Sequence, residues 1–259
     1  MTAIYAYASK TKRLGFLAAD NIEYTRKTID DKVFLVNGRF AIAVCGSDIV
    51  IHAIEVLTKF QGFTGSGKPD SSEQVIRLVA EYTRELAFGL RPKYQEAVTK
   101  RQVQEREWQI VERALTHVIV LDCVSYSLTK GDLGRPLSSE GSPNAPRCIA
   151  LSNECVLPFA LAAQVPCTTP KSIPVFTNTA GIIAYLRRRI TADKVVIREI
   201  GDLGAYVIVE CDKVQYVSAY ARPSQYIQRV FTRSIGYEIH NLVLTPNDSA
   251  RQDANVESD

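Results

Sequence analysis

Strand-like segments follow one another at the start of this chain, with no helix-like segment between them. They are apolar runs bounded by polar turns, and they cover residues 2–9, 14–20, 32–36 and 40–46. Asn37-Gly38 separates the last two runs, and it is a strong hairpin signal because both residues tolerate a positive φ. In the first run Ile4, Ala6 and Ala8 alternate with tyrosines, which predicts one strand face of each kind. The start of the chain therefore predicts an antiparallel sheet.

Blocks of helices and strands alternate along the rest of the chain. The expected segments are helices at 48–60 and 71–90, a charged and exposed helical insertion at 91–113, strands over 116–129 and 147–152, helices at 156–163 and 179–190, and strands at 204–210 and 213–220. Separate blocks predict an α+β protein with antiparallel sheets covered by helices, and they exclude a doubly wound parallel sheet. We expect one domain over residues 1–244 and a polar, disordered tail over 245–259.

Composition excludes several classes of partner and cofactor. The net charge of +3 is too small to indicate nucleic acid or an anionic membrane as the main partner. No apolar run is long enough to span a bilayer, and no signal peptide precedes the first strand. The six cysteines form no CxxC pair and the three histidines show no metal-ligand spacing. We therefore expect a cytoplasmic protein with free thiols, no metal ion and no cofactor.

One glycine-rich segment approaches a phosphate-binding motif. Residues 62–69 match the pattern GxxxxGK[ST] except at the last position, where Pro69 stands. Proline has neither the hydroxyl that the motif uses to bind magnesium nor a backbone N–H to donate. The segment also follows a predicted helix, whereas the phosphate cradle follows a strand. A loop between two helices is the better interpretation.

Thr2 stands at the head of the first strand, directly after Met1. If Met1 is removed, Thr2 carries both a hydroxyl nucleophile and a free α-amino group. An α-amine titrates near about 7.7–8.0, so it can accept the hydroxyl proton at neutral pH, itself or through a water molecule. Thr2 is thus a candidate for nucleophile and base in one residue. Without its surroundings, it is an ordinary threonine at the start of an edge strand.

Three further residues can complete such a site. Lys32 would lower the pKa of the amine and the hydroxyl by its positive charge, if a carboxylate such as Asp20 holds it in place. Gly46 ends an apolar strand just before a helix, where a backbone N–H is well placed to bind an oxyanion. Lys27 lies in the polar connection between the strands, and we interpret it as a solvated loop residue.

The stretch "TAIYAYAS…GFLAAD…KVFLVNGRFAIAVCGSD" resembles the amino-terminal part of proteasome β-type subunits and their bacterial ring-protease relatives, in the N-terminal-nucleophile (Ntn) hydrolase superfamily. The resemblance covers about the first 60 residues. It implies a four-layer αββα sandwich with two antiparallel sheets between helices. It implies Thr2 as nucleophile and base, Asp20 and Lys32 as the supporting pair, and the Gly46 N–H as oxyanion donor. The family's later Ser-Gly corner corresponds to Ser152 and Asn153, so Ser152 is an accessory candidate. For the supporting acidic residue, Glu199 and Asp202 remain open.

The resemblance also implies an activity and partners. The expected activity is threonine-type hydrolysis of peptide bonds in peptide or unfolded protein substrates, by subunits that assemble into a homo-oligomeric ring. Whether an ATPase partner delivers substrates is not indicated by the sequence. Two alternatives stay open, a non-catalytic structural subunit of the same fold and an Ntn amidase that acts on a small molecule. Proteasome α-type subunits carry a helix before the first strand, and the strand at the start of this chain favours the β-type.

Overall fold

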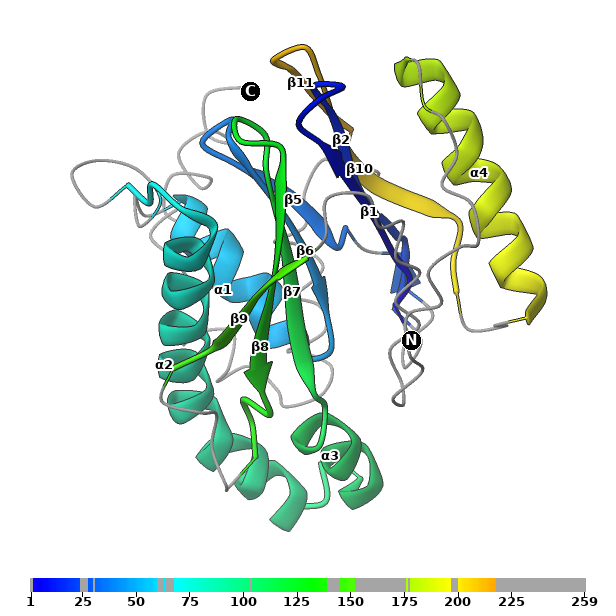
Figure 1. The fold of residues 1–259 in the computed structure, drawn as a ribbon. Helices are drawn as coiled ribbons and strands as arrows, with labels where there is room; N and C mark the ends of the chain where they lie inside the picture. The colour runs from blue at the N-terminus through cyan, green and yellow to red at the C-terminus, as the bar shows by residue number, and fades with distance from the viewer. Residues whose placement is uncertain are drawn as a thin grey trace, which may run out of the picture.

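Two antiparallel sheets form the centre of the molecule, as seen in a computed structural model (Figure 1). The structure describes residues 2–23, 28–29, 31–59, 63, 68–102, 104–138, 145–151, 176, 178–196 and 200–217. The four-stranded sheet has the order β1-β2-β10-β11, and its strands are β1 (Ile4–Ser9), β2 (Leu14–Asp20), β10 (Leu203–Glu210) and β11 (Lys213–Val217). The five-stranded sheet has the order β5-β6-β7-β8-β9, with β5 (Val33–Val36), β6 (Phe40–Cys45), β7 (Thr116–Asp122), β8 (Ser127–Gly134) and β9 (Arg147–Leu151).

The predicted hairpin at Asn37-Gly38 is confirmed. Both residues have positive φ, 55° and 65°, and Val36 pairs with Phe40 across the turn. Arg39 N donates to Val36 O at 3.1 Å and closes the turn around these two residues, and Arg39 is a third residue between the paired Val36 and Phe40, one more than in a two-residue hairpin loop.

The two sheets face each other through small and medium-sized apolar side chains. Alternate residues of each strand point into this layer, among them Ile4, Ala6, Ala8, Leu17, Ala19, Ala41, Ala43, Ile119, Leu121, Val207 and Val209. The alternation confirms the two faces predicted for the first strand, since Tyr5 and Tyr7 belong to a different cluster on its outer face. The many alanines allow the sheets to approach closely, and the buried layer excludes water.

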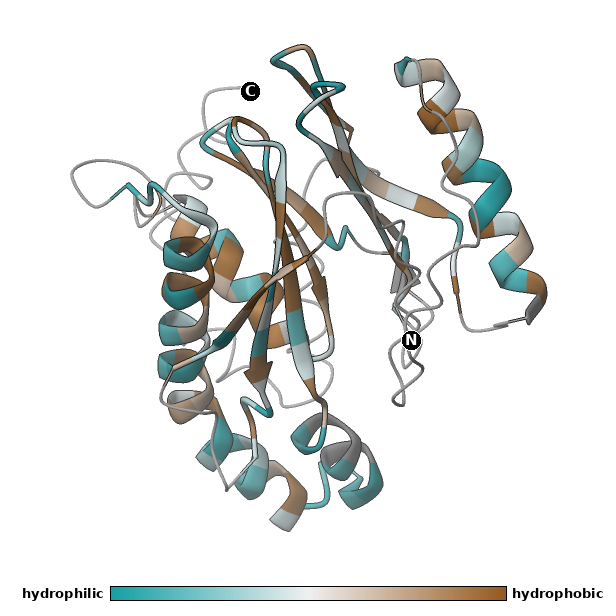
Figure 2. Cartoon of the chain, in the orientation of Figure 1, coloured by the Kyte–Doolittle hydropathy of each residue, from teal (hydrophilic) through white to brown (hydrophobic). Residues whose placement is uncertain are grey.

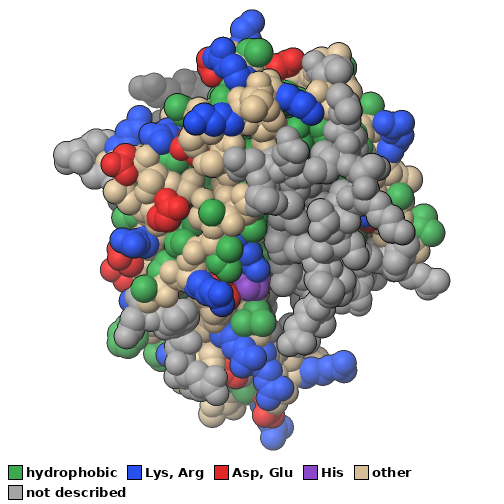
Figure 3. Space-filling view, viewed as in Figure 1, with side chains coloured by type: hydrophobic (Ala, Val, Ile, Leu, Met, Phe, Trp, Pro, Cys, Tyr) green, Lys and Arg blue, Asp and Glu red, His purple; other side chains and the backbone are tan. Residues whose placement is uncertain are grey.

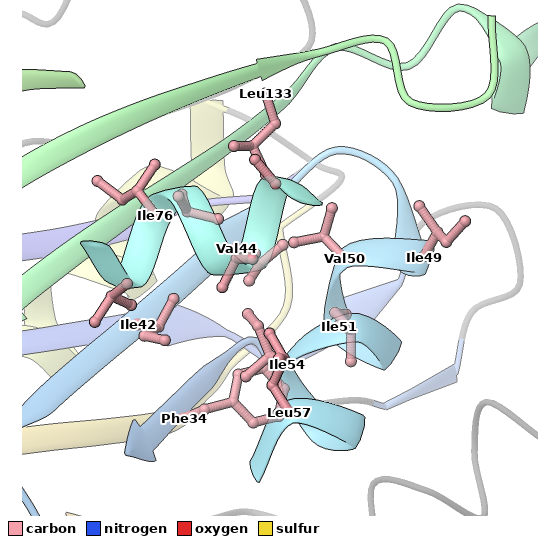
Figure 4. Packing of buried hydrophobic residues seen from close by; sticks show 14 of the residues in the cluster. Phe34, Ile42, Val44, Ile49, Val50, Ile51, Ile54, Leu57, Ile76 and Leu133 are labelled. Atoms are coloured by element: carbon pink, nitrogen blue, oxygen red, sulfur yellow. The ribbon is translucent and has the colours of Figure 1, made fainter. Parts of the chain in front are cut away.

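Two helices cover the outer face of the five-stranded sheet (Figure 1). They are α1 (Asp48–Lys59) and α2 (Ser72–Thr99), which starts at the N-cap Ser71, whose side chain accepts a hydrogen bond from Gln74 N. Figure 4 shows side chains of α1, such as Ile54 and Leu57, against Phe34 and Ile42 of the sheet. Figure 2 shows brown, apolar residues along the strands and more teal residues on α2, whose outer side faces solvent.

Helix α4 (Thr179–Val196) covers the outer face of the four-stranded sheet (Figure 1). Ile182, Leu186 and Ile190, spaced four residues apart, pack against Tyr5 and Phe16. Phe176 and Tyr185 add aromatic contacts to the same cluster. The order helix, sheet, sheet, helix confirms the α+β class and the four-layer αββα sandwich.

The strand expected over 116–129 is in fact a hairpin. β7 ends at Asp122, a four-residue turn follows, and β8 continues to Gly134, into the segment expected to be a loop. Asp122 explains the turn, because its Oδ1 accepts hydrogen bonds from the backbone N–H groups of Val124 and Ser125. Tyr126 leaves the turn with a φ of 55°.

Helix α2 does not stop at Pro92 but continues to Thr99, and α3 (Glu105–Glu112) follows after a break. The helical structure expected at 91–113 is therefore present, but the segment is not exposed throughout, because Tyr94 and Ala97 are buried against the core. Pro92 removes one helical hydrogen bond, and this loss is offset by those anchors and by Arg91, which donates to two backbone carbonyl oxygens near the end of β8. The helix bends towards its C-terminal end (Figure 1).

The connection between β2 and β5 contains a pair of two-residue strands that sequence patterns did not indicate, β3 (Ile22–Glu23) and β4 (Thr28–Ile29).

The helix expected at 156–163 and the tail at 245–259 lie outside the described residues, as does Lys27. Among the helices that the structure describes, none combines the length and apolarity needed to cross a membrane. On the face shown in Figure 3, basic and acidic side chains are interspersed.

Candidate active site

The site is built around Asp20, the last residue of β2. The β1–β2 ladder pairs Ile4 with Ala19, and its last backbone hydrogen bond runs from Asp20 N to Ala3 O at 3.0 Å. The backbone N–H of Ala3 donates to the Asp20 side chain, at 2.8 Å from Oδ1. The Asp20 carboxylate thus takes the place of a backbone acceptor at the end of the sheet, where it contacts Ala3, the residue that follows Thr2.

Lys32 crosses from the five-stranded sheet to the four-stranded sheet to meet this carboxylate. Its Nζ lies 3.0 Å from Asp20 Oδ1 and 3.1 Å from Oδ2. The backbone of Lys32 is fixed by β6, because Val44 N donates to Lys32 O at 2.9 Å. Exposed fractions of 0% for Asp20 and 5% for Lys32 make this a buried ion pair. Such a pair persists only when good geometry and further hydrogen bonds offset the desolvation of both charges.

A further donor contacts the other oxygen of the carboxylate. Gly201, two residues before β10, donates its backbone N–H to Asp20 Oδ2 at 3.1 Å. The carboxylate therefore accepts from two backbone amides and one ammonium group, which is the charge-assisted pattern that stabilises an ionised buried acid.

Thr2 lies at the entrance to β1 and is only 8% exposed. Its neighbour Ala3 is tied to Asp20 by hydrogen bonds in both directions. The structure thus brings Thr2, Asp20 and Lys32 into one buried neighbourhood. The resemblance to proteasome β-type subunits implied this association, and the register of β1 and β2 produces it.

Gly46 lies where β6 ends, two residues before α1 begins. Its φ is +112°, and a Cβ atom there would lie 2.2 Å from Leu115 O and 2.7 Å from Thr116 Cα. Only glycine fits, since both the backbone angle and the close approach exclude a side chain. The next residue, Ser47, donates its N–H to Thr116 Oγ1 at 3.1 Å. The backbone therefore turns sharply into the positive end of a helix, a suitable place for an anion.

A polar row crosses the inner face of the five-stranded sheet near Lys32. The ladders pair Cys45 with His117, His117 with Asp132, and Asp132 with Arg147. Burial raises the pKa of Cys45 to about 12 against the opposing charges of Lys130 and Lys32. The thiol is therefore protonated at neutral pH and unsuited to act as a thiolate nucleophile.

His117 in this row is held in its neutral form. Burial is the main cause that lowers the pKa of His117, the positive charge of Lys130 adds to it, and Asp132 opposes it. His117 Nδ1 lies 3.5 Å from Asp132 Oδ1. Within the described part of the chain, no group of three or more His, Cys, Asp or Glu side chains is arranged to hold a metal ion.

No known protein-family profile and no curated protein matches this sequence. Solved structures that match include a Gly-1 mutant of Anbu from Hyphomicrobium sp. strain MC1, with a TM-score of 0.48, 10% identity, and coverage of 100% of this chain and 97% of that one. Another is Anbu, described as an ancestral beta-subunit, from Yersinia bercovieri, with a TM-score of 0.47, 10% identity, and coverage of 89% and 92%. Likenesses at this level assign neither a site residue nor an activity to this chain.

The structure supports none of the accessory candidates Ser152, Glu199 and Asp202 as part of the site. Ser152 and Glu199 lie outside the described residues. The Asp202 side chain is 78% exposed and its Oδ1 lies 2.6 Å from Lys194 Nζ, so this carboxylate serves a surface ion pair. Sequence analysis missed Gly201 as a donor to Asp20. Backbone donors leave no side-chain signature, and only the register of β10 against β2 identifies this one.

Proposed function

We propose that this chain is a threonine-type N-terminal-nucleophile hydrolase of the proteasome-like class, which cleaves peptide bonds once Thr2 has become the first residue. The observation that carries the proposal is the buried Asp20–Lys32 ion pair beside Thr2. Burying two charges at the end of the sandwich costs desolvation free energy, and such a pair is retained when it has a function or many good hydrogen bonds. A function that fits this pair is to place a positive charge near a nucleophile that must lose a proton.

The proposed first step is attack by Thr2 Oγ1 on the carbonyl carbon of the scissile amide. The α-amino group of Thr2 accepts the hydroxyl proton, and the Lys32 ammonium group favours the deprotonated oxygen. The Gly46 N–H, two residues before α1, stabilises the negative charge that develops on the carbonyl oxygen.

The proposed second step is collapse of the tetrahedral intermediate. The C–N bond breaks, the α-amine of Thr2 returns the proton to the leaving nitrogen, and an ester remains between Thr2 and the acyl part of the substrate. Water then attacks this ester with the same amine as base, and the free acid and Thr2 are regenerated. Asp20 holds Lys32 throughout and takes no proton.

Matched variants at the nucleophile test the proposal. Thr2→Ala should abolish cleavage of fluorogenic peptides, while Thr2→Ser, which retains a hydroxyl and an amine, should keep measurable turnover. Both variants need the same processing, which N-terminal sequencing verifies. Full turnover by Thr2→Ala would contradict the proposal.

Two alternatives remain within the same fold. A non-catalytic structural subunit would be inactive in wild-type form although correctly processed. An amidase for small molecules would cleave small amides and leave peptides intact. A comparison of both substrate classes on the processed wild-type protein separates them. Assembly into a homo-oligomeric ring and a cytoplasmic location are part of the proposal, and light scattering of the purified protein tests the assembly.

A further inference from the structure

Asn21, directly after Asp20, ties the end of β2 to the segment that leads into β10. Its backbone N donates to Asp202 O at 3.0 Å, and its side-chain Oδ1 accepts from Asp202 N at 3.0 Å. The two bonds run in opposite directions between the same two residues. We call this arrangement the Asn21–Asp202 clamp.

The clamp lies where the main-chain ladder is irregular. β10 pairs with β2 at Leu203 and Asp20, but the register shifts before the next pair at Tyr206 and Ala18. At a shift of this kind some backbone groups lack their regular hydrogen bonds to the neighbouring strand, so the ladder holds the backbone less firmly there. The side chain of Asn21 supplies a bond at that irregularity. Packing there is tight, because a Cβ atom on Gly204 would lie 2.9 Å from Asn21 Cβ.

The residue before the clamp is the one that contacts the candidate site. Gly201 N donates to Asp20 Oδ2 at 3.1 Å, in buried surroundings. Holding Asp202 restrains the peptide plane between Gly201 and Asp202. The Gly201 N–H lies in the preceding peptide plane, which only the φ and ψ angles of Gly201 separate from it, so the directions open to this N–H are restricted as well. Asp20 is fixed in the same way from its other side, since Asn21 is its direct neighbour in the chain.

We propose that Asn21 is a positioning residue for the Asp20–Lys32 pair. By fixing Gly201 against Oδ2, the clamp orients the carboxylate so that both of its oxygens face Lys32 Nζ, at 3.0 and 3.1 Å. A carboxylate free to rotate would hold the ammonium group less firmly beside Thr2. This inference rests on the proposed function for its effect on catalysis. Its structural part stands without it.

The side chain of Asp202 offers a matched control. The clamp uses only the backbone N and O of Asp202, while its carboxylate pairs with Lys194 at the surface. Asp202→Ala therefore removes the carboxylate and leaves the clamp intact. Asn21→Ala removes the Oδ1 acceptor, and Asn21→Asp retains an oxygen acceptor at the same place.

The first test measures acylation of Thr2 by an electrophilic β-lactone. The bond from Asp202 N to Asn21 Oδ1 is solvent-exposed, so its loss corresponds to a few-fold change in an equilibrium, and we expect Asn21→Ala to slow the first-order acylation step by about threefold to tenfold. The probe concentration at half-maximal rate should stay within about twofold of wild type, since Asn21 has no proposed contact with the probe. Asp202→Ala should react at the wild-type rate, and Asn21→Asp should recover most of the loss. Wild-type kinetics in Asn21→Ala, an equal loss in Asp202→Ala, or no recovery in Asn21→Asp would each overturn the inference.

The second test needs no activity. Amide hydrogen exchange, read by NMR, should become about threefold to tenfold faster at Gly201 in Asn21→Ala, while Ala3 N–H, which donates to the other oxygen of Asp20, stays protected. Unchanged exchange at Gly201 would overturn the clamp. If the wild-type protein is never acylated, the proposed function fails, and the exchange measurement still decides whether Asn21 holds Gly201.

Discussion

Lys32 Nζ lies within 3.1 Å of both carboxylate oxygens of Asp20, although the two residues belong to different sheets. Both side chains are buried, so this pair links the two halves of the sandwich at the end where Thr2 lies. The relationship makes the pair both a structural element and the proposed support of a nucleophile. These two roles can be separated by experiment.

Removal of one partner from this pair should destabilise the fold strongly. Lys32→Met leaves a buried carboxylate without its cation, and Asp20→Asn leaves a buried ammonium group without its anion. Each should lower the free energy of unfolding by about 3–5 kcal/mol. Urea denaturation measures this loss. The double variant should lose clearly less than the sum of the two, because no uncompensated charge remains. Strictly additive losses would contradict a direct interaction.

Gly46 should tolerate no side chain. Gly46→Ala places a Cβ atom 2.2 Å from Leu115 O at a φ of +112°, and we expect a loss of more than about 3 kcal/mol from strain and collision together. Gly38→Ala is the control, because Gly38 also has a positive φ, +65°, but nothing lies within 4 Å of the added carbon. That change should cost about 1 kcal/mol. Equal losses in thermal or urea unfolding would show that the collision at Gly46 is relieved by movement.

His117 should titrate below the ordinary histidine value of about 6.5. Burial and the charge of Lys130 lower its pKa, against Asp132. When the pH falls through about 6.5, the histidine of the unfolded chain binds a proton before the buried imidazole of the folded chain does. The unfolded state then holds more protons, so the free energy of unfolding decreases as the pH falls. His117→Gln should therefore lose less stability than wild type between pH 7 and pH 5. NMR titration of the imidazole gives the midpoint directly, and a midpoint at or above 6.5 would contradict the assignment.

Two tyrosine hydroxyls should behave in opposite ways. Tyr126 Oη donates to Asp212 Oδ1 and accepts from Asp212 N, both at 2.9 Å, and so joins the β7–β8 turn to the β10–β11 turn. Tyr126→Phe should cost about 1–3 kcal/mol, because the charge-assisted bond to the Asp212 carboxylate and the acceptor for the Asp212 N–H are both lost. The Tyr7 hydroxyl is buried and has no hydrogen-bond partner in the described structure. Tyr7→Phe should be neutral or stabilising. A similar effect of both changes on the urea midpoint would refute this contrast.

Much of the fold could be predicted because its signals are local. The alternation of Ile4, Ala6 and Ala8 with tyrosines determines which face of β1 meets the other sheet, and Asn37-Gly38 determines a hairpin. The β7–β8 turn was missed because its residues, Cys123 to Tyr126, continue the apolar pattern of a strand. The turn depends on the side chain of Asp122 instead. Pro92 suggested a helix break, but buried Tyr94 and Ala97 anchor the helix beyond it.

The candidate site was predictable only in part, for a physical reason. Asp20 and Lys32 could be selected among the other charged residues of this segment because the stretch resembles proteasome β-type subunits, and the stacking of the two sheets then brings them together. Gly201 and Asn21 act through backbone groups or through a local side-chain bond, and neither leaves a mark in spacing or composition. Long-range register, here between β2 and β10, creates these contacts.

The intact mass of the protein after treatment with an electrophilic β-lactone tests the central claim most directly, since it reports processing and the nucleophile together. The account predicts a chain that lacks Met1 and carries one probe adduct, which fragmentation places on Thr2 and which is absent from Thr2→Ala. A chain that retains Met1, or a processed chain whose adduct lies elsewhere or is missing, would contradict it.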